Sequence, residues 1–250
     1  MAADARDFYD DLASDYDAVF EDWDASVRRQ GALLETMLGE ASDPILDVAA
    51  GMGTQAIGLA LRGHSVVARD LSPRLIERGR QEAARLSARL EFDVGDMRKL
   101  HPGDTGRFGT VLAFDNAFAH LDETGLAQAL AGARGALRHD GKLLVSIRDY
   151  DALTIERPTF DAPRMLGTSP HRRLIVQLWT WADDCRSYQM DHIILREDGA
   201  TWRATGRQTR CNVVLRSALS AAAHEAGLRE GRWSMPDETG FYQPSFSAVR

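Results

Sequence analysis

Two glycines and two aspartates in the segment ILDVAAGMGTQAIGLALRGHSVVARD carry the clearest chemical signal in the sequence. Gly51 and Gly53 let the backbone turn tightly and approach a ligand, just before a helix whose N-terminus offers unpaired amides. Asp70 follows about 20 residues later, where a carboxylate can accept both hydroxyls of a ribose. This combination predicts a site for a nucleoside-containing cofactor.

The residues around the glycine turn distinguish between such cofactors. The place of the third glycine in the dinucleotide fingerprint holds Ala56, so that fingerprint is incomplete. Asp47 stands shortly before Gly51, where an anion repels a pyrophosphate and attracts the ammonium of an amino acid moiety. S-adenosylmethionine (SAM) carries that ammonium and no phosphate, so the pattern favours SAM over NAD.

Strands and helices alternate over residues 44–148 and must position these groups. Short apolar runs predict strands at 45–50, 64–69, 90–94, 109–114 and 142–147, and helices are expected at 55–62, 73–86 and 124–137. This alternation is typical of right-handed crossovers and a doubly wound parallel sheet. Two final strands, 228–233 and 241–249, complete a seven-stranded Rossmann-like sheet of the α/β class.

The flanking segments have other periods. Apolar residues recur at helical spacing over 8–38, and strand-like runs at 174–181, 188–195 and 201–209 are joined by turns without a helix, which predicts a small antiparallel meander. A helix is expected at 215–226. We therefore expect lid helices in 1–40, a SAM-binding core in 41–150 and 211–250, and an antiparallel cap in 151–210 on the substrate side.

The segment LDVAAGMGTQAIGLA resembles motif I of the class I SAM-dependent methyltransferases, and VVARDLS, VGDMRKL and FDNAFAHL resemble the segments after it. The resemblance implies that these segments contact, in their order along the chain, the methionyl part of SAM, its ribose, its adenine and the reacting centre. The residues implied are, in that order, Asp47, Ala49, Gly51 and Gly53; Asp70 and Leu71; Asp96 and Met97; and Asp115, Asn116 and His120.

The N-terminal stretch FYDDLASDYDAVFEDWDASV resembles the lid helix of small-molecule methyltransferases, which implies that Tyr16 and Trp23 close over the cofactor. DNAFAHL and SIRDYD are similar to their counterparts in glycine N-methyltransferases. This implies that Arg148 binds a substrate carboxylate or another electron-rich oxygen. The alternative is that Arg148 neutralises Asp149 or Asp151.

The meander is shorter than in the glycine enzymes and rich in tryptophan, so glycine itself is in doubt as the acceptor. An aromatic pocket suits a planar heterocycle, as in toxoflavin-type N-methyltransferases. Asn116, His120 and Arg148 are expected to contact the substrate together with aromatic residues. These aromatic residues are Tyr9, Tyr150, Trp179 and Tyr242, with Trp181 and Trp202 nearby.

The predicted function is methyl transfer from SAM to a small molecule in secondary metabolism, most often at nitrogen, with S-adenosylhomocysteine (SAH) as the product. His120 is the expected base if the acceptor is an acidic ring N–H, phenol or enol. Three alternatives remain: a small-molecule O-methyltransferase, an NAD-dependent oxidoreductase that uses the same glycine turn, and a non-catalytic nucleoside-binding partner.

Composition narrows the partners. The chain has 250 residues, 44% of them hydrophobic, and a net charge of −7, which provides no basic patch for nucleic acid. Cys185 and Cys211 form neither a disulfide framework nor a metal motif, so no metal is expected. The acidic N-terminus and the lack of a long apolar run predict a cytoplasmic protein without a membrane span, as a monomer or homodimer.

Overall fold

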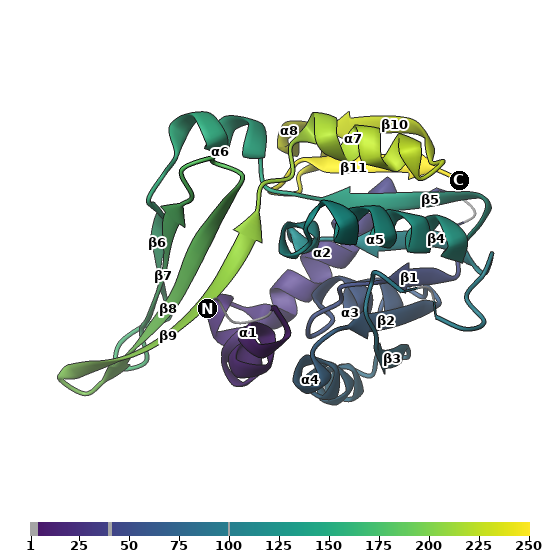
Figure 1. Ribbon diagram of the computed structural model, residues 1–250. Helices are drawn as coiled ribbons and strands as arrows, with labels where there is room; N and C mark the ends of the chain where they lie inside the picture. The colour runs from purple at the N-terminus through teal and green to yellow at the C-terminus, as the bar shows by residue number, and fades with distance from the viewer. Residues whose placement is uncertain (1–4, 40–41, 100) are drawn as a thin grey trace.

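The computed structural model describes residues 5–39, 42–99 and 101–250, which fold around two β-sheets (Figure 1). The larger sheet has seven strands in the order β10-β11-β5-β4-β1-β2-β3. All pairs are parallel except those that β11 makes with β5 and β10. The predicted doubly wound, Rossmann-like sheet of the α/β class is confirmed. Its strands are β1 (Ile45–Asp47), β2 (Val66–Asp70), β3 (Glu91–Val94), β4 (Phe108–Ala113), β5 (Leu137–Ser146), β10 (Arg229–Ser234) and β11 (Ser245–Val249).

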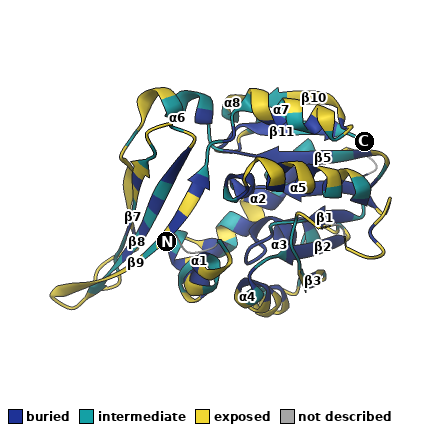
Figure 2. Cartoon of the chain, in the orientation of Figure 1, coloured by how far each residue is buried: buried dark blue, intermediate teal, exposed yellow. Residues whose placement is uncertain are grey.

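Helices cover both faces of this sheet. One hydrophobic cluster joins the sheet to α2 (Trp23–Met37), α3 (Thr54–Ala60) and α4 (Pro73–Arg85), and another joins it to α5 (Glu123–Ala136) and α7 (Arg216–Glu225). Neighbouring side chains of a strand point to opposite faces, so Ile45 belongs to one cluster and Leu46 to the other. The central strands are buried throughout, whereas the helices expose their outer faces (Figure 2).

Two glycines allow α2 and α3 to cross at backbone contact. A Cβ added to Gly31 would lie 2.4 Å from the carbonyl carbon of Gly58, so no side chain fits between the helices. This contact fixes α3, the helix that follows the glycine turn. At the other end of the βαβ unit, Ser72 caps α4 by accepting from the amide of Leu75 at 3.1 Å, and Pro73 occupies the first turn, as expected.

The second sheet has four antiparallel strands, one more than the expected meander. They are β6 (Phe160–Leu166), β7 (Arg173–Trp181), β8 (Ser187–Asp198) and β9 (Thr201–Asn212). β6 lies before the first of the three expected strands, in a segment for which no strand was expected. β6 is an edge strand that contains Pro163, and its register with β7 shifts between Asp161 and Arg164, which is where a sheet tolerates proline.

Short helices occupy segments for which no helix was expected, namely α6 (Tyr150–Glu156) and α8 (Pro236–Thr239). At the N-terminal end, α1 (Ala5–Leu12) and the 3-10 helix η1 (Ala13–Val19) precede α2, and α1 lies between β9 and the main sheet (Figure 1). No helix within the described ranges is long and apolar enough to cross a membrane.

Candidate functional site

A cleft of about 920 Å³, including its open mouth, lies at the carboxyl ends of the central strands and beneath α1 and η1. The carboxyl ends of parallel strands are where open α/β sheets bind ligands. The structure brings many of the predicted site residues to this cleft. They are Tyr9, Tyr16, Ala49, Gly51, Asp70, Leu71, Asp96, Met97, Asp115 and His120.

The glycine turn forms the floor of the cleft. Gly51 and Gly53 have φ values of +56° and +91°, which a residue with a side chain rarely adopts. The amide of Gly51 donates to the Asp70 carboxylate at 2.8 Å, so the turn and the end of β2 are joined directly. Tyr16 covers this turn from η1, because a Cβ on Gly51 would lie 3.1 Å from its hydroxyl oxygen.

Asp70 and Asp115 line the cleft, and Asp47 is buried next to the lining residues Val48 and Ala49. Within the described part of the chain, the hydrogen-bond donors to these three carboxylates are neutral groups. Asp47 accepts from the amide of Ala49 at 3.2 Å, and Asp70 accepts from the amides of Gly51 and Ser72, each at 2.8 Å. Asp115 accepts from the Gln55 amide at 2.7 Å and from the Tyr242 hydroxyl at 2.6 Å.

Burial raises the pKa of all three carboxyl groups, and that of Asp47, which is 1% exposed, reaches about 8. Asp70 and Asp115 add to this rise at Asp47 by like-charge repulsion. These carboxylates therefore fit a cationic ligand better than a pyrophosphate. The glycine turn lies beside Asp70, whose carboxylate can accept the hydroxyls of a ribose, and this fits the nucleoside part of such a ligand.

Asp115 is presented by a strained turn at the end of β4. Asp115 and Asn116 both have left-handed φ values, +56° and +66°. The amide of Asp115 donates to Ser146 Oγ at 2.8 Å, and this hydroxyl donates to Gln243 Oε1 at 2.9 Å. Asn116 is buried and accepts from the amide of Arg148 at 3.1 Å. Hydrogen bonds from β5 and the segment before β11 thus hold the turn.

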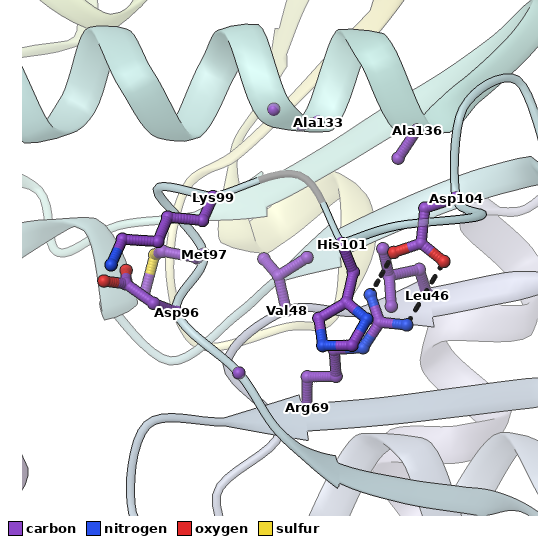
Figure 3. A pocket seen from close by; sticks show the side chains of 12 residues that line it. Leu46, Val48, Arg69, Asp96, Met97, Lys99, His101, Asp104, Ala133 and Ala136 are labelled. Atoms are coloured by element: carbon purple, nitrogen blue, oxygen red, sulfur yellow. Dashed lines mark hydrogen bonds and ion pairs between the residues drawn. The ribbon is translucent and has the colours of Figure 1, made fainter.

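At the predicted adenine side, the Arg98 guanidinium binds the Asp96 carboxylate, and its Nη2 donates at 2.7 Å. This hydrogen bond holds the pKa of Asp96 below its usual range. Met97 lines the cleft beside it. A second cavity of about 320 Å³ lies on the other side of this loop, beside Lys99, His101 and the buried Arg69–Asp104 ion pair (Figure 3). Gly95, Asp96 and Met97 therefore border a cavity on both sides.

On the opposite wall, the Tyr9 hydroxyl and His120 Nε2 are 3.0 Å apart, and the two rings meet edge to face. Tyr9 comes from α1, and His120 ends the short 3-10 helix η2 (Ala117–His120) after β4. A phenol and an imidazole in hydrogen-bond contact can orient a polar acceptor and exchange a proton with it.

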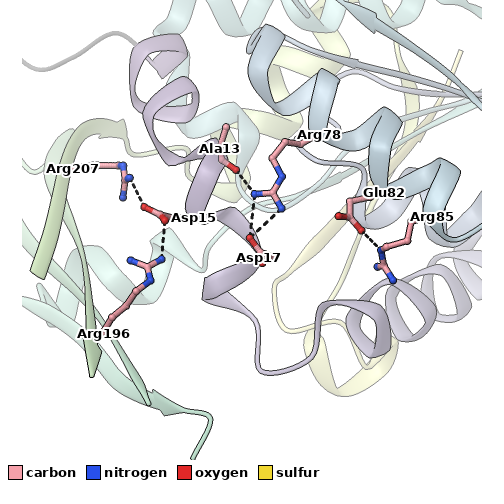
Figure 4. Close-up of polar contacts among 8 residues, drawn as sticks. All are labelled: Ala13, Asp15, Asp17, Arg78, Glu82, Arg85, Arg196 and Arg207. Carbon is pink, nitrogen blue, oxygen red and sulfur yellow. Dashed lines mark hydrogen bonds and ion pairs between the residues drawn. The ribbon is translucent and has the colours of Figure 1, made fainter. Parts of the chain in front are cut away.

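Ion pairs and a hydrogen bond hold η1 over the cleft from two directions (Figure 4). Asp15 bridges Arg196 Nη2 at 2.8 Å and Arg207 Nη2 at 2.5 Å, which ties η1 to β8 and β9. Arg78 of α4 donates to the carbonyl of Ala13 at 2.8 Å and to Asp17 at 3.2 Å. η1 is therefore bound to the second sheet through β8 and β9, and to α4, which packs on the main sheet.

The structure places several predicted residues away from the cleft. Trp23, expected over the cofactor, instead starts α2, is buried in the core and lies 6.0 Å below the Arg85 guanidinium; the bend after η1 turns it away. Gly53 faces Phe92 rather than the cleft. Trp202 lies on the outer face of the second sheet, under Arg172.

Arg148 lies behind the cleft wall. Its guanidinium donates to the Tyr188 hydroxyl at 2.5 Å and to Gln177 at 2.9 Å, and it stacks on Trp179 at 4.7 Å. The alternative expectation, that it neutralises Asp149 or Asp151, was wrong, because Arg216 pairs with both of them. A set of neighbouring aromatic residues joins this group, namely Tyr150, which bonds Asn116, and Trp181 beside Tyr188.

Sequence reasoning missed Gln55, which joins the floor of the cleft to the turn that carries Asp115. Its amide donates to Asp115 and to Gln30 of α2, each at 2.7 Å. Gln55 occupies an unconstrained position of the dinucleotide fingerprint, directly before Ala56, and a polar residue in the first turn of the helix after the glycine turn was the signal available. In residues 5–39, 42–99 and 101–250, no group of three His, Cys, Asp or Glu is arranged to hold a metal ion.

Comparison with known proteins agrees with this geometry. A family described as methyltransferase domain matches residues 45–141. A glycine/sarcosine N-methyltransferase from Parasynechococcus marenigrum is 31% identical over 150 residues, which are 59% of this chain and 53% of that protein. The chain thus spans about half the length of that curated relative.

Two solved structures share the fold. SAM-bound CalS10, an amino pentose methyltransferase from Micromonospora echinaspora, has a TM-score of 0.69 at 21% identity and covers 97% of this chain and 91% of its own. The sugar N-methyltransferase KedS8 from Streptoalloteichus has a TM-score of 0.68 at 17% identity and covers 91% and 86%. At these identities, the likeness shows the architecture.

Proposed function

We propose that this chain transfers a methyl group from SAM to a nitrogen atom of a small molecule, because residues 45–141 match a methyltransferase domain family and a glycine/sarcosine N-methyltransferase is 31% identical over 150 residues. The single observation that carries the proposal is that Asp70 and Asp115 line one cleft while Asp47 is buried close enough to be repelled by both, and that the hydrogen-bond donors to all three among the described residues are neutral groups. A ligand that brings positive charge relieves the repulsion among these carboxylates.

Bound SAM supplies a methyl group on a positively charged sulfur, which is electrophilic without further activation. Asp47 would hold the ammonium of the amino acid moiety, and Asp70 with Leu71 would hold the ribose. Asp96 and Met97 would meet the adenine ring on the loop that borders both cavities. These roles assign partners to the ammonium, the ribose and the adenine of the ligand.

Nitrogen is favoured as the acceptor atom because both the curated relative and the solved structures include N-methyltransferases. Their acceptors, named as glycine, sarcosine and sugars, are small. In this chain, Tyr9 and His120 form the wall that would orient the acceptor, and Arg148 remains a candidate for a substrate oxygen if the wall between it and the cleft rearranges.

Most of the rate would come from alignment. Methyl transfer is an in-line displacement, so holding the nucleophile in line with the methyl carbon and sulfur converts a bimolecular encounter into a unimolecular step. Tyr16, which lies over Gly51, and Tyr9 close the cleft from the N-terminal segment and would exclude water from it.

Calorimetric titration of the purified chain with SAH, and separately with NAD, tests the cofactor. We expect SAH to bind and NAD not to bind, and Asp70→Ala to weaken SAH binding by about tenfold or more because a carboxylate that accepts two hydroxyls is lost. Asp140→Asn is a matched control, since Asp140 is exposed, does not line the cleft and has a left-handed φ of +58° that asparagine tolerates. Binding of NAD alone would refute the proposal.

A screen with isotope-labelled SAM would then identify the atom that is methylated. Glycine, sarcosine, amino sugars and nitrogen heterocycles are the first acceptors, and phenols are included as oxygen nucleophiles. Label found on nitrogen supports the proposal, and label found only on phenol oxygen assigns the chain to the O-methyltransferases instead.

A further inference from the structure

Asp115 differs from Asp47 and Asp70 in where it stands and what it touches. Asp47 and Asp70 end β1 and β2 and accept from backbone amides, whereas Asp115 follows β4 and accepts only from side chains. It lies on the same short segment as His120, with Ala117 between them also lining the cleft. Its carboxylate is therefore on the acceptor's side of the cofactor turn.

We propose that the acceptor is a basic amine that enters the cleft as an ammonium ion, and that Asp115 holds this ammonium and takes its proton before methyl transfer. This inference rests on the proposed function. The proposal favours aliphatic amines as acceptors, including amino sugars and amino acid esters, over neutral heterocycles, amides and phenols. It also assigns the proton to Asp115 instead of His120.

The hydrogen bonds of Asp115 leave room for such a ligand. Oδ2 is fixed by Gln55, which is itself anchored on Gln30 inside the core. Oδ1 accepts only from Tyr242, a side chain that is 64% exposed and lies in the segment between α8 and β11. One oxygen is thus held in place, while the other is bonded to a donor that can turn outward into solvent when an ammonium replaces it.

The charge of the site favours a cation at this position. In the part of the chain that the structure describes, no arginine or lysine donates to Asp115, and the two side chains that do are a neutral amide and a neutral phenol. Burial raises the pKa of Asp115, which brings it toward the range in which a carboxylate can accept a proton from an ammonium. A neutral heterocycle or phenol would leave the carboxylate without a counter-charge in a desolvated cleft.

The proposed step balances. A proton moves from the acceptor ammonium to Oδ1 of Asp115, which leaves a neutral amine and a neutral carboxylic acid. The nitrogen lone pair then forms the N–C bond to the methyl carbon as the C–S bond breaks, and the electrons of that bond stay on sulfur. The methylated product is an ammonium, and the proton on Asp115 returns to solvent when the cleft opens.

Sinefungin tests the charge at this position without knowledge of the acceptor. In sinefungin, a carbon that bears an ammonium replaces the methylated sulfur of SAM, whereas SAH has neutral sulfur there and is otherwise alike. The ratio of their dissociation constants therefore reports the interaction of a cation with the acceptor side of the cleft. Calorimetry at pH 7.5 gives both constants for each variant.

We expect Asp115→Asn to reduce the preference for sinefungin over SAH by about tenfold or more, because a charged hydrogen bond is lost. Asparagine suits the left-handed backbone at this position and keeps one acceptor oxygen for Gln55, so the turn is retained. Asp10→Asn removes a carboxylate that bonds Ser72 at the rim and does not line the cleft, and it should leave the ratio within about twofold.

Tyr242→Phe provides an opposite change. It removes the hydroxyl that donates to Oδ1, so the preference for sinefungin should rise by a few-fold, whereas a purely structural role of Tyr242 would weaken both ligands together. A sinefungin-to-SAH ratio that is the same in Asp115→Asn and the unmodified chain, with both ligands still bound, overturns this inference alone. If neither ligand binds the unmodified chain, the proposed function fails and the inference with it.

Discussion

The Asp47 carboxyl group is placed where its charge is unfavourable unless a cation is bound. Its pKa rises from 3.8 to about 8 in the folded chain, first because of burial. Between those two values the folded chain binds more protons than the unfolded chain does, so this group makes folding less favourable as the pH rises. The stability is fully present at low pH and is lost as the pH rises through about 8.

Asp47→Asn should therefore separate stability from ligand binding. We expect the melting temperature of the ligand-free variant to exceed that of the parent chain by a few degrees at pH 8 and by much less at pH 5. SAH affinity at pH 8 should fall by about tenfold, because the ammonium loses its counter-charge. Thermal melts at the two pH values check the first claim, and equal differences at both would contradict it.

His120 belongs to the acceptor's wall rather than to the cofactor's floor. We expect His120→Ala to lower turnover by about a hundredfold with the best acceptor of the screen, while SAH affinity changes by less than about twofold. Tyr9→Phe, which removes the hydroxyl 3.0 Å from His120 Nε2, should lower turnover in the same direction. Equal loss of turnover and SAH affinity would instead make His120 a cofactor or structural residue.

The structure brings predicted single residues to the cleft where chemistry and position coincide in the chain. Gly51, Asp70, Asp96 and Asp115 stand at strand ends, and a strand end can be recognised locally. Arg148 also follows a strand, yet its side chain turns toward β7 and β8, whose tyrosine and tryptophan are distant in the sequence. No local pattern contains that information.

Among the elements, the contact between α2 and α3 determines how precisely the glycine turn is placed. Gly31→Ala would put a methyl group 2.4 Å from the backbone of Gly58, so the helices must separate. Overpacking of this kind costs about 1 to 3 kcal/mol, and we expect the melting temperature to fall by several degrees with weaker SAH binding. Gly206→Ala is the control, since a Cβ there meets only Ile193 at an ordinary 3.8 Å.

The outcome of that experiment is clear in either direction. A melting temperature unchanged by Gly31→Ala would mean that the two helices slide apart freely and do not position the turn. A comparable fall in Gly206→Ala would mean that the cost comes from the extra methyl group anywhere in the chain.

The periodicity of the sequence predicted the elements of the main sheet because strands and helices alternate there and each has its own apolar pattern. It failed for β6, whose residues are exposed up to Leu166 and include Pro163. An edge strand of a small sheet buries too little to show alternation, so its pairing with β7 depends on a partner that lies outside any local window.

At the scale of the whole molecule, η1 connects β8 and β9 of the second sheet to α4, which packs on the main sheet. We expect Asp15→Asn to speed SAH dissociation by several-fold in stopped-flow measurements, because η1 loses its bonds to Arg196 and Arg207. The melting temperature should change little, since a partly exposed ion pair contributes little to folding. Asp198→Asn breaks the exposed pair with Arg203 on the same sheet and should leave the rate unchanged.

The arrangement of the whole site was beyond sequence reasoning for a physical reason. Tyr242 reaches Asp115 across 127 positions of the chain, and Tyr9 reaches His120 across 111. Such contacts follow from the order of strands in the sheet and from the path of α1, and each residue alone has many partners of the right chemistry. The division into lid, core and cap remains a prediction in the same sense.

The position of β11 in the chain determines when the site is completed during synthesis on the ribosome. This strand follows all the other described elements in the chain, yet it inserts between β5 and β10, and Tyr242 and Gln243, just before it, bond the turn that carries Asp115 and its neighbour Ser146. A ribosome therefore delivers the cofactor turn long before it delivers the residues that fix Asp115. A chain that ended before Tyr242, and so before β11, would lack the bonds from Tyr242 to Asp115 and from Ser146 to Gln243 that hold the turn at Asp115.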